Sequence, residues 1–110
     1  MRVGLKTILL NGDMSSATVT SDTIDLTAQN MVSIQAVWSG SPVGSIGLEF
    51  TNSLAGTPTW TPVDDTAQDV NGAGSYGRNC YNIAYPYLRV VYTKTSGTGI
   101  LNASAYNKGF

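Results

Sequence analysis

Residues 31–38 read Met-Val-Ser-Ile-Gln-Ala-Val-Trp, and this stretch decides the fold class. Every even-numbered residue from Val32 to Trp38 is apolar, whereas Ser33 and Gln35 between them are polar. Successive side chains of a β-strand point to opposite faces, so this alternation gives the strand one buried and one exposed face. The stretch therefore predicts a half-buried strand of a sheet.

The rest of the chain repeats this alternation in short segments separated by turn signals. No segment shows an apolar period of 3.6 residues, so we expect no helix. We predict strands over residues 5–10, 16–26 (one kinked strand or two), 31–38, 45–51, 60–63, 76–83, 87–94 and 100–106. Two packed antiparallel sheets bury such strands efficiently. We therefore predict a single all-β domain over residues 1–110, an antiparallel sandwich, with a jelly roll of about eight strands as the favoured variant.

The connections between these strands lead to further expectations. Gly and Pro in Ser39–Gly44 and Gly in Thr95–Gly99 favour tight turns, so each connection is expected to close a hairpin. The two hairpins would join residues 31–38 to 45–51 and residues 87–94 to 100–106. Residues 64–77 are predicted to be the least structured stretch. Residues 1–12 are expected to form an arm or an edge strand.

Composition excludes several partners. Charged residues make up 12% of the chain, with a net charge of −1 and no basic cluster. Binding to nucleic acid needs such a cluster to displace counterions from phosphates, so we expect no nucleic-acid partner. The apolar patch Ile8-Leu9-Leu10 is too short for a signal peptide or a membrane span, which predicts synthesis in the cytoplasm and no membrane partner. A surface poor in charge is typical of a subunit docked on an assembly.

Catalytic groups are scarce. The chain has no His, so it offers no Ser-His or Cys-His pair, and its single cysteine, Cys80, is expected to be a small buried or half-buried apolar residue. Asp64, Asp65 and Asp69 fall in the least structured stretch and lack the spacing of a dedicated calcium loop. We therefore predict no catalytic residue, no metal and no cofactor. A small hydrolase that uses Asp64 or Glu49 stays as a remote alternative.

Aromatic residues are the most informative candidates for binding. Trp38, Phe50 and Tyr92 fall on predicted inward faces, whereas the other aromatic residues fall at strand ends or in loops. Exposed aromatic and Arg side chains are typical anchors of protein interfaces, although they also cover the ends of a sandwich or stack on sugar rings. The predicted contact residues are Arg2, Lys6, Trp60, Tyr76, Arg78, Tyr81, Tyr85, Tyr87 and Phe110.

From about residue 24 to its end, the chain resembles small virion proteins of tailed bacteriophages and prophages. The resemblance rests on Ile34–Gly44 (IQAVWSGSPVG), Trp60–Val63 (WTPV), Tyr87–Gly99 (YLRVVYTKTSGTG) and Lys108-Gly109. Its most specific part is Arg89 within an apolar strand, followed by Tyr-Thr and then Ser-Gly-Thr-Gly. The first two dozen residues show no such likeness.

The resemblance implies a jelly-roll cement or decoration protein. Such a protein binds the major capsid protein lattice on the outside of a phage head as a homodimer or homotrimer. Arg89 would either reach out to a carboxylate, cap the end of the sandwich, or pair within the chain with Asp64, Asp65 or Asp69. The alternative function is a carbohydrate-binding or adhesin module on a head fibre or tail. That function requires two or three exposed aromatic residues on one face with Asp or Asn beside them, Trp60 among them.

Overall fold

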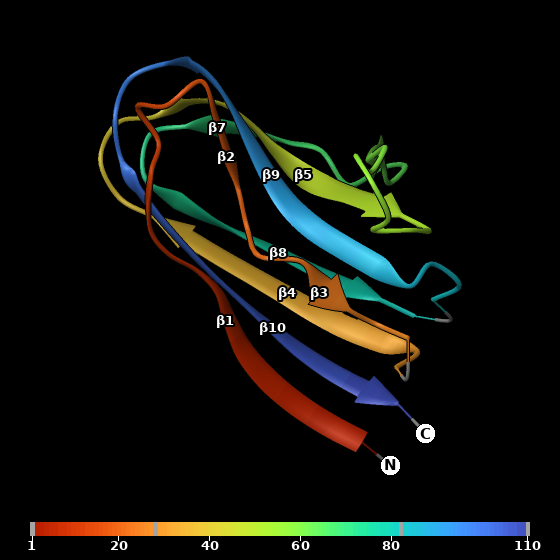
Figure 1. Ribbon diagram of the computed structural model, residues 1–110. Helices are drawn as coiled ribbons and strands as arrows, with labels where there is room; N and C mark the ends of the chain where they lie inside the picture. The colour runs from red at the N-terminus through yellow and green to blue at the C-terminus, as the bar shows by residue number, and fades with distance from the viewer. Residues whose placement is uncertain (1, 28, 82, 110) are drawn as a thin grey trace.

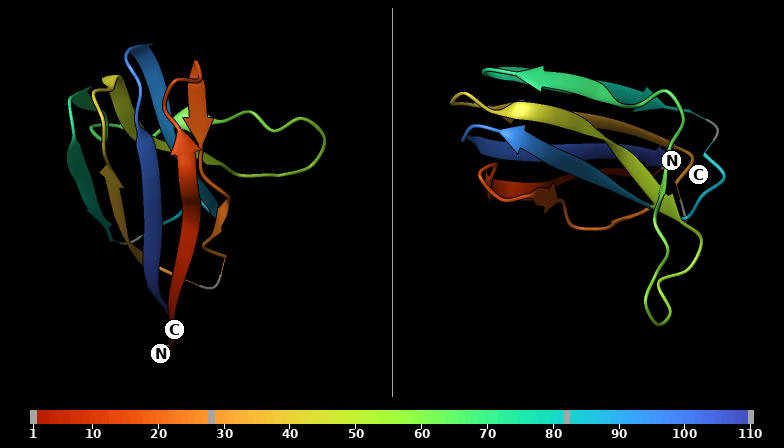
Figure 2. Two further views of the ribbon diagram at one scale, coloured as in Figure 1. Left: turned by 90° about the vertical axis from the view of Figure 1, so that its left-hand side faces the viewer. Right: turned by 90° about the horizontal axis from the view of Figure 1, so that it is seen from above.

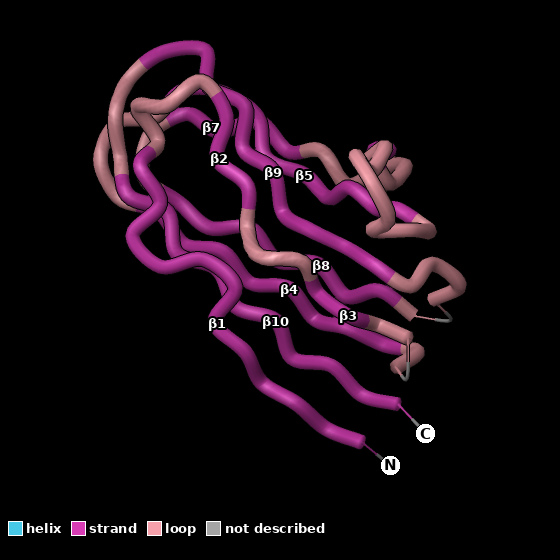
Figure 3. Tube along the Cα trace, viewed as in Figure 1, coloured by secondary structure: helices cyan, strands magenta, loops and turns pink. Residues whose placement is uncertain are grey.

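Residues 31–38 form strand β4 (Met31–Trp38) of the computed structural model, with the predicted alternation of faces. Val32, Ile34 and Ala36 are buried, whereas Ser33 and Gln35 are exposed. The structure describes residues 2–27, 29–81 and 83–109. Within these residues the chain forms ten strands and no helix, so the predicted all-β fold is confirmed (Figure 3).

The other strands follow the predicted segments closely, with one addition. They are β1 (Arg2–Asp13), β2 (Thr18–Thr20), β3 (Ile24–Asp25), β5 (Val43–Thr51), β6 (Thr61–Pro62), β7 (Gln68–Asn71), β8 (Gly74–Cys80), β9 (Tyr87–Ser96) and β10 (Ile100–Gly109). The addition is β7, within residues 64–77, which were predicted to be the least structured stretch. Val70 is its one buried residue, so the sequence carries almost no alternation there. Residues 1–12 were predicted as an arm or an edge strand, and β1 is an edge strand.

Two antiparallel sheets pack face to face (Figures 1 and 2). Sheet A has the order β1-β10-β4-β8, and sheet B has the order β2-β9-β5-β6. Strand β3 also pairs with β9, and β7 also pairs with β5, so β2/β3 and β6/β7 are two interrupted strands. Counted in this way, the sandwich has eight strands, and nearly every connection crosses from one sheet to the other. This order is that of a jelly roll, as predicted.

Both predicted hairpins are wrong, because their strands belong to different sheets. Strand β4 lies in sheet A and β5 in sheet B, while β9 lies in sheet B and β10 in sheet A. The two connections pack against each other instead, and the Ser41 N–H donates to the Thr98 carbonyl oxygen over 2.9 Å. Alternation determines which face of a strand is buried but not which strand lies beside it. A short turn rich in Gly and Pro can connect two strands of one sheet, and it can equally connect a strand of one sheet to a strand of the other.

The core lies between the sheets and includes residues from both. Its buried apolar side chains are Ile8, Met14, Ile24, Leu26, Val32, Ile34, Ala36, Trp38, Ile46, Leu48, Val70, Tyr76, Leu88, Val90, Tyr92, Leu101, Ala103 and Ala105. Trp38 and Tyr92 are core residues, as predicted, and Phe50 is partly buried against the core. Buried hydroxyl and indole groups keep partners, because an unpaired polar group in the core is costly. The Tyr92 hydroxyl donates to the Val43 carbonyl oxygen over 3.1 Å.

Candidate functional site

The outer face of sheet A is a regular surface that four strands present to solvent. Strand pairing places its side chains in three rows that run across the sheet. The rows are Leu5–Tyr106–Ser33–Asn79, Thr7–Ser104–Gln35–Gly77 and Asn102–Val37–Ser75. We call these residues the neutral face. Residues next to them along each strand, such as Ile34 and Ala103, point into the core.

The neutral face contains no charged residue in these rows. Its largest apolar side chains are well exposed: Leu5 is 73% exposed, Val37 50% and Tyr106 40%. The other positions carry Ser, Thr, Asn, Gln and Gly. Depletion of charge together with exposed aromatic and aliphatic side chains is the composition of the buried centre of a protein interface. The face is therefore a candidate contact surface.

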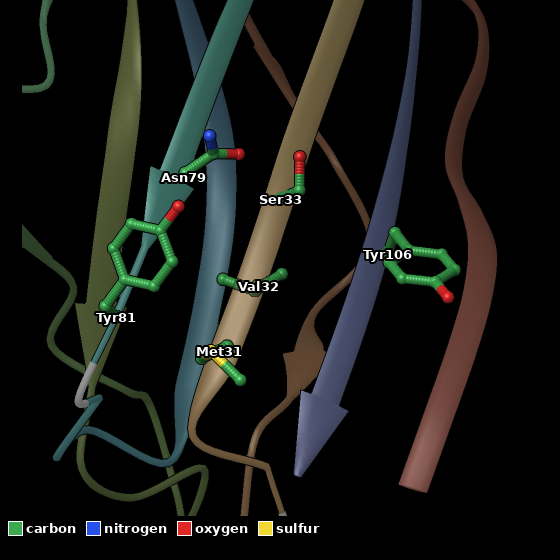
Figure 4. A pocket seen from close by; sticks show the side chains of 6 residues that line it. All are labelled: Met31, Val32, Ser33, Asn79, Tyr81 and Tyr106. Carbon is green, nitrogen blue, oxygen red and sulfur yellow. The ribbon is translucent and has the colours of Figure 1, made fainter.

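Two hollows lie on this side of sheet A. The first has a volume of about 210 Å³ and is lined by Met31, Val32, Ser33, Asn79, Tyr81 and Tyr106. Figure 4 shows Tyr81 and Asn79 on one side of β4, Tyr106 on the other side, and Ser33 on β4 itself. The second hollow has a volume of about 340 Å³ and is lined by Thr7, Leu9, Leu10, Gln35, Val37, Asn102, Ala103 and Ser104. Both hollows are open to solvent. Side chains of a partner could enter them.

The outer face of sheet B differs in charge. Strand pairing places Asp25, Glu49, Asp69 and Arg89 on it, and we call it the charged face. Arg89 Nε and Nη2 donate to Glu49 Oε1 over 3.0 and 2.8 Å. The predicted pairing of Arg89 with Asp64, Asp65 or Asp69 is wrong, because β9 lies beside β5, which brings Glu49 directly opposite Arg89.

Trp60 belongs to this cluster. The Arg89 guanidinium lies 4.3 Å from the centre of the Trp60 ring, a cation–π contact. One face of the Trp60 ring is therefore covered by the chain's own arginine. The loop at residues 52–60, which ends at Trp60, projects from one end of the sandwich (Figure 2).

The carboxylate of Asp25 is fixed in its charged form. The Thr27 backbone N–H and hydroxyl both donate to Asp25 Oδ1, over 2.9 and 2.7 Å. These hydrogen bonds lower the pKa of Asp25, with the backbone bond as the larger cause. The charged face therefore keeps this negative charge through the physiological pH range.

Several predicted contact residues occupy other places than expected. Tyr76 is only 3% exposed, and its hydroxyl donates to the Thr66 carbonyl oxygen over 2.7 Å. The prediction that Tyr76 is a contact residue is wrong, because β8 turns this side chain into the core. Arg78 donates to the Asp65 carbonyl oxygen and so holds the segment before β7.

Tyr85 connects the two sheets near the end of the sandwich. Its ring stacks on Phe50 with the centroids 5.2 Å apart. Burial, with Cys80 as a further cause, raises the pKa of Tyr85 to about 12. Cys80 is half-buried, as predicted. Tyr85 is thus a packing residue of the β8–β9 connection.

The remaining predicted contact residues divide by exposure. Tyr81 is 65% exposed and lines the first hollow, so it is available to a partner. Lys6 is exposed on β1, and Tyr87 is half-buried on β9. The side chain of Arg2 and the whole of Phe110 lie outside the described part of the chain.

Sequence reasoning missed most of the neutral face. Ser33, Gln35 and Asn79 have no individual signal of function, and Leu5 and Tyr106 are far apart in the sequence. Two features of the sequence pointed to this face: the low charge of the whole chain and the uncharged residues at the outward positions of β4. Recognising a face also requires knowing which four strands lie side by side.

Among the described residues, no group of three or more Asp, Glu or Cys side chains lies close enough together to hold a metal ion. The same part of the chain contains no helix that is long and apolar enough to cross a membrane.

Comparisons with known proteins extend these observations. No protein-family model matches the chain, and no curated protein sequence matches it. Solved structures do match over nearly the whole chain. PBSX exported protein XepA has a TM-score of 0.69 and 12% identity, covering 97% of this chain and 37% of XepA. SPBc2 prophage-derived protein YomS has a TM-score of 0.61 and 8% identity, covering 96% and 93% of the two chains.

A chain from a virus structure also has a similar fold. A chain in the structure of infectious bursal disease virus, Gx strain, has a TM-score of 0.55 and 19% identity. The match covers 97% of this chain and 32% of the viral chain. At such identities the likeness shows the fold alone. The chain therefore has an all-β sandwich fold that prophage-derived and viral proteins also have.

Proposed function

We propose that the chain is a structural protein of a bacteriophage virion. In this proposal it binds the major capsid protein lattice on the outside of the head through the neutral face, and this binding stabilises the shell. The neutral face is the single observation that carries the proposal. The fold shared with prophage-derived and viral proteins supports it, as does the sequence resemblance to small virion proteins.

The chemistry of the neutral face suits a protein partner. Burying a charged group without a partner is costly, whereas Ser, Asn and Gln side chains can exchange water for hydrogen bonds across an interface. Leu5, Val37 and Tyr106 supply apolar area at the same surface. Each contact can be modest in strength, because a shell that holds many copies multiplies it.

The test uses expanded heads assembled from the major capsid protein of the same phage, without this chain. Purified chain is added, and binding is measured by co-sedimentation and by electron microscopy of the heads. We expect saturable binding at a fixed ratio to the capsid protein and an increase in the temperature at which the heads break. Failure to bind, or heads that break at an unchanged temperature when fully occupied, would contradict the proposal.

A second function, carbohydrate binding, is favoured by one observation. Tyr81 and Tyr106 lie on opposite sides of Ser33 at the first hollow, and Asn79 lies beside Tyr81 (Figure 4). Aromatic rings with neutral hydrogen-bonding groups beside them suit an uncharged sugar. Trp60, the residue expected from the sequence, suits it less well, because Arg89 covers one face of its ring.

A glycan array separates the two functions. Carbohydrate binding predicts selective retention of a neutral glycan that is lost in the Tyr81→Ala variant and kept in the Trp60→Ala variant. An array without selective binding, together with saturable binding to heads, leaves the structural function alone.

A further inference from the structure

Strand β1 is the long open edge of sheet A. It pairs with β10 from Arg2↔Gly109 to Thr7↔Ser104 without interruption, and the register then shifts between Thr7 and Leu9. On its other side β1 has no neighbouring strand among the described residues (Figure 1). The Asp22 N–H donates to the Ile8 carbonyl oxygen over 2.8 Å, so the β2–β3 connection covers the edge at that point. The segment from residue 3 to residue 7 is open.

Along an antiparallel strand, the backbone N–H and C=O groups of successive residues point alternately to the two neighbouring strands. This alternation shows which backbone groups of β1 point away from the sheet. The Ser39 N–H donates to the Ile100 carbonyl oxygen, so even-numbered residues of β10 direct their backbone groups towards β4. Odd-numbered residues of β10 therefore face β1, where Ala105 pairs with Lys6 and Asn107 pairs with Gly4. It follows that Val3, Leu5 and Thr7 direct their backbone N–H and C=O groups away from the sheet.

The other edges of the sandwich are shorter or partly covered, and this distinguishes β1. At the β8 edge, the Gln68 amide donates to the Ser75 carbonyl oxygen over 3.1 Å, and Arg78 holds the segment that follows β6. The edges of sheet B consist of strands of two to four residues. Short or covered edges are the usual defence against pairing with another chain.

We propose that β1 pairs with β1 of a second copy of this chain, antiparallel and two-fold symmetric about Leu5. In this register Leu5 lies opposite Leu5, and Val3 lies opposite Thr7, so the outward backbone groups on both chains find partners. The two Leu5 side chains, each 73% exposed alone, come together at the axis. The pairing would join two four-stranded sheets into one of eight strands.

The register limits the charge cost of pairing with a second copy, because the two Lys6 residues are diagonal neighbours and not directly opposite each other. Lys6 is a residue type that often protects an edge from pairing. Centred on Leu5, the register places Lys6 opposite Gly4 of the other copy and not opposite another lysine. The joined sheet also brings the two neutral faces side by side. An isologous contact of this kind closes as a dimer.

Backbone variants test the pairing. The Leu5→Pro variant removes an N–H that points off the edge, and proline is tolerated at such a position, so the fold is kept. The Leu5→Ala variant keeps the N–H and removes only the side-chain contact. Sedimentation velocity over a range of protein concentrations should give a dimer for the unaltered chain, a weaker dimer for Leu5→Ala and a monomer for Leu5→Pro. Circular dichroism checks that all three are folded.

Cross-linking tests the register in a Cys80→Ala background. Paired residues at the axis have their Cα atoms about 5.5 Å apart, within disulfide range, so the Leu5→Cys variant should form a covalent dimer on oxidation. Thr7 and its symmetry mate are four residues out of register, about 14 Å apart, so the matched Thr7→Cys variant should not. A monomer at all concentrations, a trimer, a dimer unaffected by Leu5→Pro, or equal cross-linking at both positions would overturn the proposal. Leu5 is itself a residue of the neutral face, so binding of the unaltered chain to heads, and not binding of the Leu5 variants, tests the proposed function.

Discussion

The outer faces of the two sheets are built on the same strand geometry and differ in charge. The neutral face of sheet A has no charged residue in its three rows, whereas the charged face of sheet B carries Asp25, Glu49, Asp69 and Arg89. On the charged face the chain satisfies its own groups, since Arg89 binds Glu49 and covers Trp60. On the neutral face, Leu5 and Val37 stay largely exposed.

Under the proposed function, this difference indicates which side of the sandwich would face the capsid. A face whose charges are already paired within the chain, or stay hydrated, gains little from being buried, because desolvation offsets new contacts. A face of neutral polar and apolar groups gains from burial. Substitutions in the connections between the sheets and on the charged face should therefore lower the free energy of unfolding, whereas substitutions on the neutral face should weaken binding.

The largest effect is expected where the two sheets are joined. Gly97 has φ +82° in the β9–β10 connection, and a Cβ there would overlap the Ser41 carbonyl oxygen. The Gly97→Ala variant should lose about 3 kcal/mol or more, measured by chemical denaturation. In the Gly56→Ala control, at φ +63° with open space around it, only the backbone cost of about 1–2 kcal/mol should appear. Equal losses would show that the two connections are not packed together.

The ion pair on the charged face should have a smaller effect. The Arg89→Ala variant removes both the Glu49 pair and the contact with Trp60, at a cost of about 1–2 kcal/mol. Glu49→Ala removes only the pair and should cost less. Asp69→Ala, on the same face, is the control and should change stability by no more than about 0.5 kcal/mol. Equal costs for Arg89→Ala and Glu49→Ala would mean that the contact between Arg89 and Trp60 adds nothing to the free energy of unfolding.

Tyr85, in the connection between the sheets, should make stability depend on alkaline pH. Its pKa is about 12 in the folded chain, whereas an unfolded tyrosine ionises near pH 10. The unfolded state therefore releases its proton first, and stability falls as pH rises from about 10 to 12. The Tyr85→Phe variant lacks this contribution and should lose less stability over that range. Unfolding curves with the same pH dependence for both proteins would contradict the assignment.

The sequence predicted the strands better than their neighbours. Residues 31–38 became β4 with the same bounds, because a strict period of two has one structural interpretation. The hairpins failed because the turns at Ser39–Gly44 and Thr95–Gly99 do not encode whether the chain stays in one sheet. Tyr76 was misplaced because Gly and polar residues around it obscure the alternation of β8.

The candidate site was predictable only in outline. Low charge indicated a docked protein, and Tyr81 was named as a contact residue from its sequence position alone. The neutral face itself depends on the pairing of β1, β10, β4 and β8, which lie far apart in the chain. Pairing over such sequence separations is set by the whole core and not by any local pattern.

The most direct test places a charge on each face in turn and measures binding to expanded heads. Gln35 lies in the middle row of the neutral face, and Thr93 is its exposed counterpart on the charged face. Each position is changed to Glu and to Lys. None of these four variants should change the free energy of unfolding by more than about 0.5 kcal/mol. Both Gln35 variants should weaken binding about a hundredfold, because either sign of charge is buried without a partner, whereas both Thr93 variants should bind as the unaltered chain does. Unchanged binding by the Gln35 variants, or an equal loss with the Thr93 variants, would contradict the assignment of the neutral face as the surface that meets the capsid.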